Sequence, residues 1–117
     1  MKVDVKAKLE IDIPRTMSRF DPKYQAAQKW LDNEVLKDSE PYVPFDTGML
    51  ARSGQTGTQL GSGDIVYSAP YAKRLYYGKG MHFNTHAHPQ ASAQWFEKAK
   101  AVRGKNWVEG AERVLKK

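Results

Sequence analysis

Residues 2–13 alternate strictly between charged and apolar side chains. Apolar residues occupy the odd positions from Val3 to Ile13, and charged residues occupy the even positions from Lys2 to Asp12. Successive side chains of a β-strand point to opposite faces, so this period of two predicts a strand with one face on a core. The other face is expected in water or against a neighbouring subunit, as in an antiparallel sheet. Pro14 is expected to end the strand.

A helix is predicted to open at Asp21-Pro22 and to end near Lys37 or Asp38, before Pro41. Apolar residues recur there at helical spacing, with Trp30 beside them, and polar residues fill the other positions. The apolar set is Tyr24, Ala27, Leu31 and Val35, and the polar set is Lys23, Gln25, Lys29, Asp32 and Lys37.

A hairpin is predicted around Gly61-Ser62-Gly63, where glycine suits backbone angles with positive φ. Its strands would be residues 55–60 and 64–68. The second strand is the stronger prediction, because Ile65, Val66 and Tyr67 have high β-propensity.

The C-terminal segment predicts either two consecutive helices or one long helix kinked at Gly104. Asn106 with Glu109 resembles an N-cap followed by a capping box. Trp95, Phe96, Ala99 and Val102 form one apolar stripe, and Trp107, Val108, Ala111, Val114 and Leu115 form another.

Short strands and helices in this order favour an α+β fold, in which helices pack on one face of a small, mainly antiparallel sheet. The length of 117 residues predicts one domain, residues 1–117, with a flexible arm or loop at about 78–90. The chain lacks cysteine, which excludes disulfides, thiolate zinc sites and thiol nucleophiles. No apolar run approaches the ~20 residues of a membrane span, and the first residues lack the apolar region of a secretory signal. We therefore expect a soluble protein that is made and kept in a cytoplasm.

The net charge of +6 is unevenly distributed. Residues 1–50 carry eight Lys/Arg and nine Asp/Glu, whereas residues 51–117 carry eleven Lys/Arg and four Asp/Glu. The basic excess of the second half suits contact with nucleic acid or with an acidic neighbouring subunit, or simply a solvated basic face.

Two short motifs each predict a short helix with residues that favour its beginning and its end. In Pro44-Phe45-Asp46-Thr47-Gly48-Met49-Leu50-Ala51-Arg52-Ser53-Gly54, Asp46 is a good N-cap residue and Gly54 suits the left-handed position that ends a helix. In Ala69-Pro70-Tyr71-Ala72-Lys73-Arg74-Leu75-Tyr76-Tyr77-Gly78, Pro70 suits a first turn, with Tyr71, Leu75 and Tyr76 turned inward and Gly78 and Gly80 ending the helix.

The segment between Gly78 and Pro89 carries His82, His86 and His88. Three imidazoles could supply a zinc site. However, the spacing is not that of a metalloprotease helix, and no acidic residue lies in the loop to act as a general base. The favoured interpretation is an extended arm, formed by Met81, His82 and Phe83, that contacts an adjacent subunit.

No other enzymatic signature is convincing. Asp46-Thr47-Gly48 matches the triplet of aspartic proteases, but that chemistry needs two carboxylates that share a proton, and the following residues read as helix. No phosphate-binding fingerprint and no nucleophile elbow is present. We therefore expect no catalytic residue, no cofactor and no metal.

Together the two motifs resemble the D-T-G-x-L-x-x-S and Y-A-x-x-x-(aromatic)-G elements of phage minor capsid or head–tail joining (tail-completion) proteins. The C-terminal segment Gln94-Trp95-Phe96-Glu97-Lys98-Ala99-Lys100-Ala101 is also similar to phage minor capsid components. After Gly80 the chain departs from the tail-completion pattern, because His88-Pro89-Gln90-Ala91 replaces the usual apolar ending.

The resemblance implies a structural, non-enzymatic virion protein that is synthesised in the host bacterial cytoplasm. It implies a homo-oligomeric ring that joins the portal-connector side of the head to the tail, with contact to the packaged DNA as a secondary role. The implied interface residues are Asp46, Thr47, Gly48, Leu50, Tyr71, Ala72, Tyr76, Gly78, Met81, His82 and Phe83.

The alternative hypothesis is a basic nucleic-acid-binding module. Lys98, Lys100, Arg103 and Lys105 would contact phosphates, and Trp95 and Trp107 would stack on bases. This hypothesis requires exposed tryptophans, whereas helical spacing favours tryptophans in the core.

Overall fold

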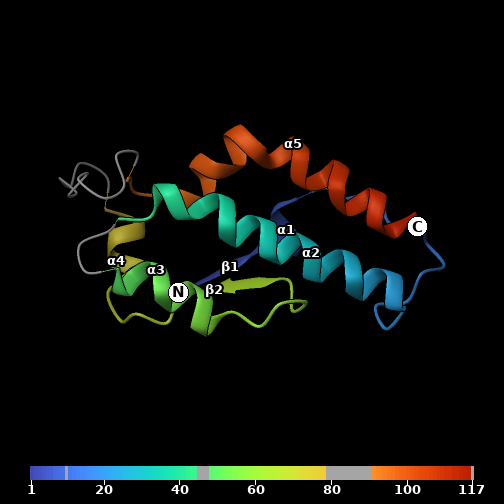
Figure 1. Ribbon diagram of the computed structural model, residues 1–117, viewed down its shortest axis with the longest axis horizontal. Coiled ribbons are helices and arrows are strands. Elements are labelled where there is room, and N and C mark those ends of the chain that lie inside the picture. The colour runs from blue at the N-terminus through green and yellow to red at the C-terminus, as the bar shows by residue number, and fades with distance from the viewer. Residues whose placement is uncertain (10, 45–47, 79–90, 117) are drawn as a thin grey trace.

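Two long helices, α2 (Pro22–Ser39) and α5 (Trp95–Leu115), form the frame of the fold. The computed structural model describes residues 1–9, 11–44, 48–78 and 91–116. α2 and α5 pack along each other over much of their length (Figure 1). α2 begins as predicted, because the Asp21 carboxylate accepts a hydrogen bond from the Lys23 amide at 2.8 Å. It ends at Ser39, one residue beyond the predicted limit, and continues into the short 3-10 helix η1 (Glu40–Tyr42).

The buried face of α2 contains Ala27, Leu31 and Val35, which confirms the predicted apolar stripe. Asp32 was expected at a polar, solvated position, and that prediction is wrong, because its side chain is fully buried. Gly110 of α5 lies directly against the Trp30 ring, and a Cβ atom there would overlap the ring. The absence of a side chain at Gly110 therefore lets the two helices approach closely.

α5 is one continuous helix, which confirms the alternative of one long helix that contains Gly104. The predicted N-cap at Asn106 is wrong. Its first turns are buried through Trp95, Phe96 and Ala99, and its second half is buried through Trp107, Ala111 and Leu115. Val102, predicted on the apolar stripe, is 64% exposed. Figure 1 shows the helix arching over its middle part. The rings of Phe96 and Trp107 stack at 5.9 Å and fill the core between the two ends, so the middle of the helix need not supply an apolar residue.

The sheet consists of β1 (Lys2–Asp4) and β2 (Asp64–Val66), which pair antiparallel with Val3 opposite Ile65. The predicted strand over residues 2–13 is therefore wrong beyond Asp4, where the chain forms the single helical turn α1 (Val5–Lys8). The Asp4 carboxylate caps this turn by accepting from the Ala7 amide at 3.1 Å. Val5 and Leu9 are both buried. Residues four apart share a face of a helix, so the same apolar positions fit the turn as well as they fit a strand.

The predicted hairpin is also wrong, because β2 pairs with β1 rather than with residues 55–60. Residues 55–57 instead complete helix α3 (Met49–Gly57). The positive φ angles predicted for the glycine turn are confirmed at 99° for Gly61 and 83° for Gly63. The second motif forms the short helix α4 (Ala72–Tyr76).

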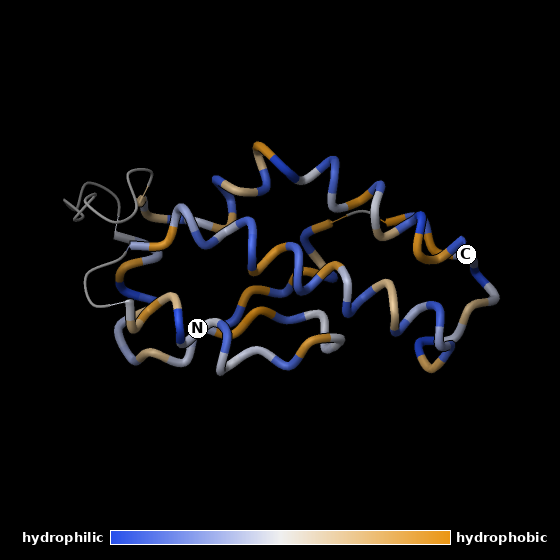
Figure 2. The backbone as a smooth tube through the Cα atoms, viewed as in Figure 1, coloured by the Kyte–Doolittle hydropathy of each residue, from blue (hydrophilic) through white to orange (hydrophobic). Residues whose placement is uncertain are grey.

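Buried side chains from β1, β2 and the four helices α2 to α5 join in one hydrophobic cluster. Figure 2 shows the apolar residues of α2 and α5 recurring at intervals along each helix, between hydrophilic turns. The molecule is elongated, with principal extents of 47 × 24 × 20 Å. Its helices and small antiparallel sheet confirm the predicted α+β class. Within the described residues, no helix has both the length and the apolar character to span a bilayer.

Candidate assembly surface

The two sequence motifs lie at one end of the molecule, which we call the motif end. It comprises the start of α3, helix α4 and residues 91–95 at the start of α5, on the left in Figure 1. Backbone hydrogen bonds join residues 91–95 to α4 and to the 3-10 helix η1. The Gln94 amide donates to the Tyr76 carbonyl at 2.8 Å, and the Ser92 amide donates to the Tyr42 carbonyl at 2.9 Å. The motif end is thus assembled from segments that are far apart in the sequence.

Aromatic rings fill the interior of the motif end. Trp95 is fully buried, and the rings of Tyr76 and Tyr67 pack edge-on against it at 4.7 Å and 5.3 Å. Burial raises the pKa of Tyr76 to about 12 and also raises the pKa of Tyr67. Both phenols therefore remain neutral at physiological pH, and their role here is packing.

In the first motif, Gly48 is the N-cap of α3 and has a φ of 81°, a conformation that favours glycine. Leu50 and Ser53 are buried, and the Ser53 hydroxyl donates to the Leu50 carbonyl at 2.7 Å. Gly54 was predicted to end the helix, and that prediction is wrong because α3 continues to Gly57. A Cβ atom at Gly54 would lie 2.5 Å from Cε1 of Tyr67, so glycine serves close packing here.

The predicted interface residues have different positions. Leu50, Ala72 and Tyr76 are buried and support the motif end from inside, whereas Tyr71 and Gly78 are half-buried. Asp46, Thr47, Met81, His82 and Phe83 lie outside the described residues, as do Gly80 and the three histidines. Because Gly48 is the N-cap of α3, the predicted N-cap at Asp46 is wrong. The predicted arm, and the expectation that the histidines bind no metal, stay predictions.

Two exposed apolar residues of the motif end escaped the sequence analysis. Met49 is 54% exposed, and Tyr77 is 62% exposed although its ring packs edge-on against that of Tyr76 at 5.2 Å. Met49 directly precedes the buried Leu50, and Tyr77 directly follows the buried Tyr76. The helical period contains the signal, because neighbours in a helix point in directions about 100° apart, so Met49 and Tyr77 point away from the buried Leu50 and Tyr76 that they adjoin.

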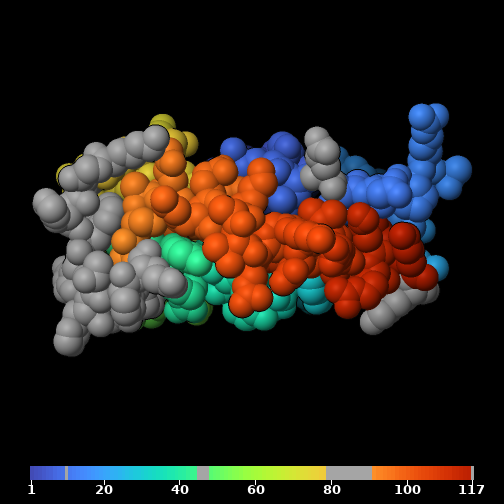
Figure 3. Space-filling model, turned by 90° about the horizontal axis from the view of Figure 1, so that it is seen from above, coloured from blue at the N-terminus to red at the C-terminus, as the bar shows by residue number. Residues whose placement is uncertain are grey.

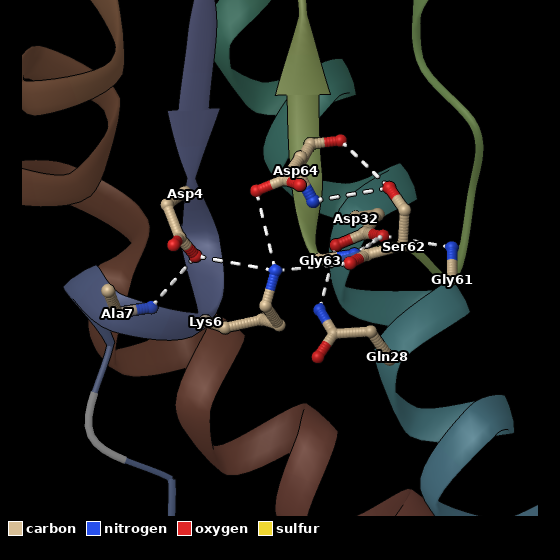
Figure 4. Close-up of polar contacts among 9 residues, drawn as sticks. All are labelled: Asp4, Lys6, Ala7, Gln28, Asp32, Gly61, Ser62, Gly63 and Asp64. Carbon is tan, nitrogen blue, oxygen red and sulfur yellow. Dashed lines mark hydrogen bonds and ion pairs between the residues drawn. The ribbon is translucent and has the colours of Figure 1, made fainter. Parts of the chain in front are cut away.

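The most developed polar cluster lies elsewhere, around the buried carboxylate of Asp32 (Figure 4). Its Oδ2 accepts from the Gly61 amide at 2.8 Å and from the Gly63 amide at 2.9 Å, and its Oδ1 accepts from Nε2 of Gln28 at 2.8 Å. Burial raises the pKa of Asp32, although these three hydrogen bonds oppose the shift. Both oxygens are occupied, so the carboxylate anchors the loop that precedes β2.

Lys6 closes this cluster from the other side. Its Nζ lies 3.4 Å from Asp64 and 3.5 Å from Asp4, and it donates to the Ser62 carbonyl at 3.2 Å. Among the described residues, no group of three His, Cys, Asp or Glu side chains could hold a metal ion. The cluster therefore reads as a structural junction between α1, α2 and the loop.

The basic residues proposed for nucleic-acid binding lie along α5, which Figure 3 shows crossing one broad face of the molecule. Lys98, Arg103 and Lys105 are exposed and Lys100 is half-buried. Trp95 and Trp107 are 0% and 1% exposed, so they are core residues and cannot stack on bases. The stacking part of that hypothesis is therefore wrong, and only the surface cations remain.

The chain matches no curated protein and no solved structure. A family model described as minor capsid protein matches residues 4–115, nearly the whole chain. The match includes both motifs, β2 and helices α1 to α5, and it begins at Asp4, the last residue of β1. It agrees with the resemblance that the two motifs suggested. The chain therefore belongs to the family of phage minor capsid proteins.

Proposed function

We propose that this virion protein is a component of the head–tail junction, where identical copies form a ring between the portal connector and the tail. Family membership supports the coarser part of the proposal, a structural protein of the phage particle. The finer part depends on the motif end, and in particular on Met49 and Tyr77, which expose apolar surface at the end of the molecule that carries both motifs.

The mechanism is geometric rather than catalytic. In a ring, each subunit presents one surface to the next copy and a different surface to its own other neighbour, and the ring closes only at the correct rotation. Tyr77 suits such a contact because aromatic side chains supply a large contact area at interfaces. Its ring is already oriented by Tyr76, so little conformational freedom remains to be lost on docking.

The test is the assembled mass of the purified protein, alone and mixed with the phage's connector and tail proteins, measured by light scattering after size exclusion. We expect a discrete ring or a complex that forms only with one of those partners. Tyr77→Ser should weaken this assembly by about tenfold or more, as expected of an aromatic residue at the centre of an interface.

Val102→Ser is the matched control, because Val102 is 64% exposed on α5, outside the motif end. It should leave the assembled mass unchanged, and circular dichroism should show that both variants are folded. A monomer that ignores both partners would refute the proposal. A monomer that instead binds DNA at moderate salt would favour the nucleic-acid hypothesis.

A further inference from the structure

A groove of about 620 Å³ lies between the start of α2 and the loop that precedes β2. Its walls include Arg19, Phe20, Tyr24 and Lys29 on one side and Leu60 on the other. The groove takes no residue from α3, α4 or α5, so it is separate from the motif end. It combines exposed apolar side chains with cations.

Phe20 is the most exposed large apolar residue of the described chain, at 85%. It directly precedes the N-cap Asp21, a position from which an apolar side chain often packs against the fourth residue of the helix. That residue is Gln25, so no apolar partner is available within the helix. Hydrogen bonds nevertheless fix the backbone, because the Phe20 amide donates to the Ser18 hydroxyl at 3.1 Å and the Asp21 amide donates to the Ser18 carbonyl at 3.0 Å. The turn thus fixes the backbone at Phe20 while the side chain stays largely exposed to solvent.

Leu60 adds to the apolar surface of the groove. It is 37% exposed, and the loop that carries it is anchored through the hydrogen bonds from Gly61 and Gly63 to Asp32. Tyr24 is half-buried beside it in the lining. A single exposed apolar residue needs no explanation, but several in one fixed groove indicate a binding surface.

The charged lining of the groove is entirely cationic. It consists of Lys6, Arg19 and Lys29, with no carboxylate among the lining residues. Lys6 is already neutralised by Asp4 and Asp64. Within the described part of the chain, Arg19 and Lys29 pair with no carboxylate, so two cations are available to a partner.

We propose that this groove binds an acidic segment of another virion protein, with an apolar side chain against Phe20 and Leu60 and carboxylates near Arg19 and Lys29. A second copy of this chain fits less well, because its net charge of +6 would repel the same cations. Nucleic acid also fits less well, because two free cations match one or two carboxylates, whereas DNA binding at physiological salt draws on many phosphate contacts. The inference depends on membership of the virion and not on the head–tail role.

The test uses overlapping 15-residue peptides that cover the proteins of the same virion, together with a single-stranded oligonucleotide. Each fluorescent probe is titrated with the full-length protein, and binding is followed by anisotropy. The wild type is compared with Phe20→Ser and with the double variant Arg19→Gln/Lys29→Gln. Val102→Ser and Lys98→Gln are the matched controls, since they alter one exposed apolar residue and one exposed cation of α5.

We expect one or a few acidic peptides that contain Leu, Phe or another large apolar residue to bind. Each groove variant should weaken them by at least about fivefold, the controls should not, and higher salt should weaken the wild type. The proposal is overturned if no peptide is sensitive to the groove variants, or if only the oligonucleotide is. Since Phe20 is exposed, its replacement should leave folding intact, which circular dichroism verifies. If the wild-type protein binds the peptides through the groove but forms no ring, the proposed head–tail function is contradicted and the groove proposal is not.

Discussion

At the scale of single residues, Asp32 shows how a carboxylate can serve the fold without serving a reaction. A buried polar atom lowers stability when it has no partner, and here the partners come from a loop about thirty residues later in the sequence. Sequence periodicity placed Asp32 among solvated residues because the pattern of one helix contains no information about a distant glycine loop. The glycine turn itself was predictable, since Gly61 and Gly63 both adopt positive φ.

Asp32→Ala is expected to lower the free energy of unfolding by about 1–3 kcal/mol, because it leaves the buried Gly63 amide without an acceptor. Asp32→Asn should cost much less. Its amide oxygen can accept from both glycine amides, and Gln28 can turn its own oxygen toward the new NH₂ group. Urea denaturation followed by circular dichroism measures both. Equal losses in the two variants would contradict this account of the hydrogen bonds.

The wild type and the Asp32→Asn variant together also test the charge state of Asp32. Its pKa in the folded protein is raised above the ordinary value of 3.8, so folding favours the protonated carboxyl. The stability of the wild type relative to Asp32→Asn should be greatest below pH 3.8 and should fall as pH rises through the folded pKa. Unfolding free energies measured between pH 3 and pH 7 provide the comparison. A difference that grows with pH would show that the hydrogen bonds outweigh burial.

At the scale of elements, the two glycines inside α5 have opposite consequences. Gly110 is buried against Trp30, whereas a Cβ atom at Gly104 would meet only the flexible Lys100 side chain, at 3.2 Å. Their sequence context looks alike, because each interrupts an otherwise helical pattern. The difference depends on the distance to a neighbouring helix, which no local propensity encodes.

Gly110→Ala is therefore expected to destabilise the protein by about 1–3 kcal/mol through overpacking against Trp30. Gly104→Ala should stabilise it by about 0.5–1 kcal/mol, because alanine loses less backbone entropy in a helix. Thermal melts of the two variants beside the wild type measure both signs. If Gly110→Ala is neutral, α2 and α5 can separate slightly without cost, and the close approach is not needed.

A helix or strand was predictable when the residues that determine it lie close together in the sequence. α2 was recognised because Asp21, Pro22 and the apolar period lie within one segment. Residues 5–9 were mistaken for strand because Val5 and Leu9 satisfy both periods, and only the Asp4 cap and the shortness of β2 decide between them. The predicted hairpin failed because β2 takes its partner from the start of the chain. Strand pairing at such separation leaves no local trace.

At the scale of the whole molecule, the motifs were recognised correctly but most of their described residues proved to be internal supports. Leu50, Ala72 and Tyr76 are buried, and the exposed apolar surface comes from neighbouring Met49 and Tyr77. These buried motif residues support the shape of the motif end, where the Tyr76 ring packs against Trp95. Prediction of the surface itself required the orientation of each helix, which only the fold supplies.

One hydrophobic cluster links β1, β2 and α2 to α5, so we infer that residues 1–117 form a single cooperative domain. Denaturation followed by tryptophan fluorescence and by far-ultraviolet circular dichroism should give one midpoint. Trp30 in α2, Trp95 at the start of α5 and Trp107 near its middle report on the packing of the two helices, and the rings of Phe96 and Trp107 stack on each other. Separate midpoints for the two signals would show that the chain does not unfold as one cooperative unit.

The pairing of β1 with β2 also determines the order in which a nascent chain can fold. Of the two strands, Lys2–Asp4 is synthesised before Asp64–Val66 and has no partner until the second strand follows. Trp95 and Trp107 complete the core only after that. Helix α2 is long enough to begin forming during translation, but its apolar face stays uncovered until α5 arrives. Productive folding therefore waits until α5 has been synthesised, and until then the apolar face of α2 is open to aggregation.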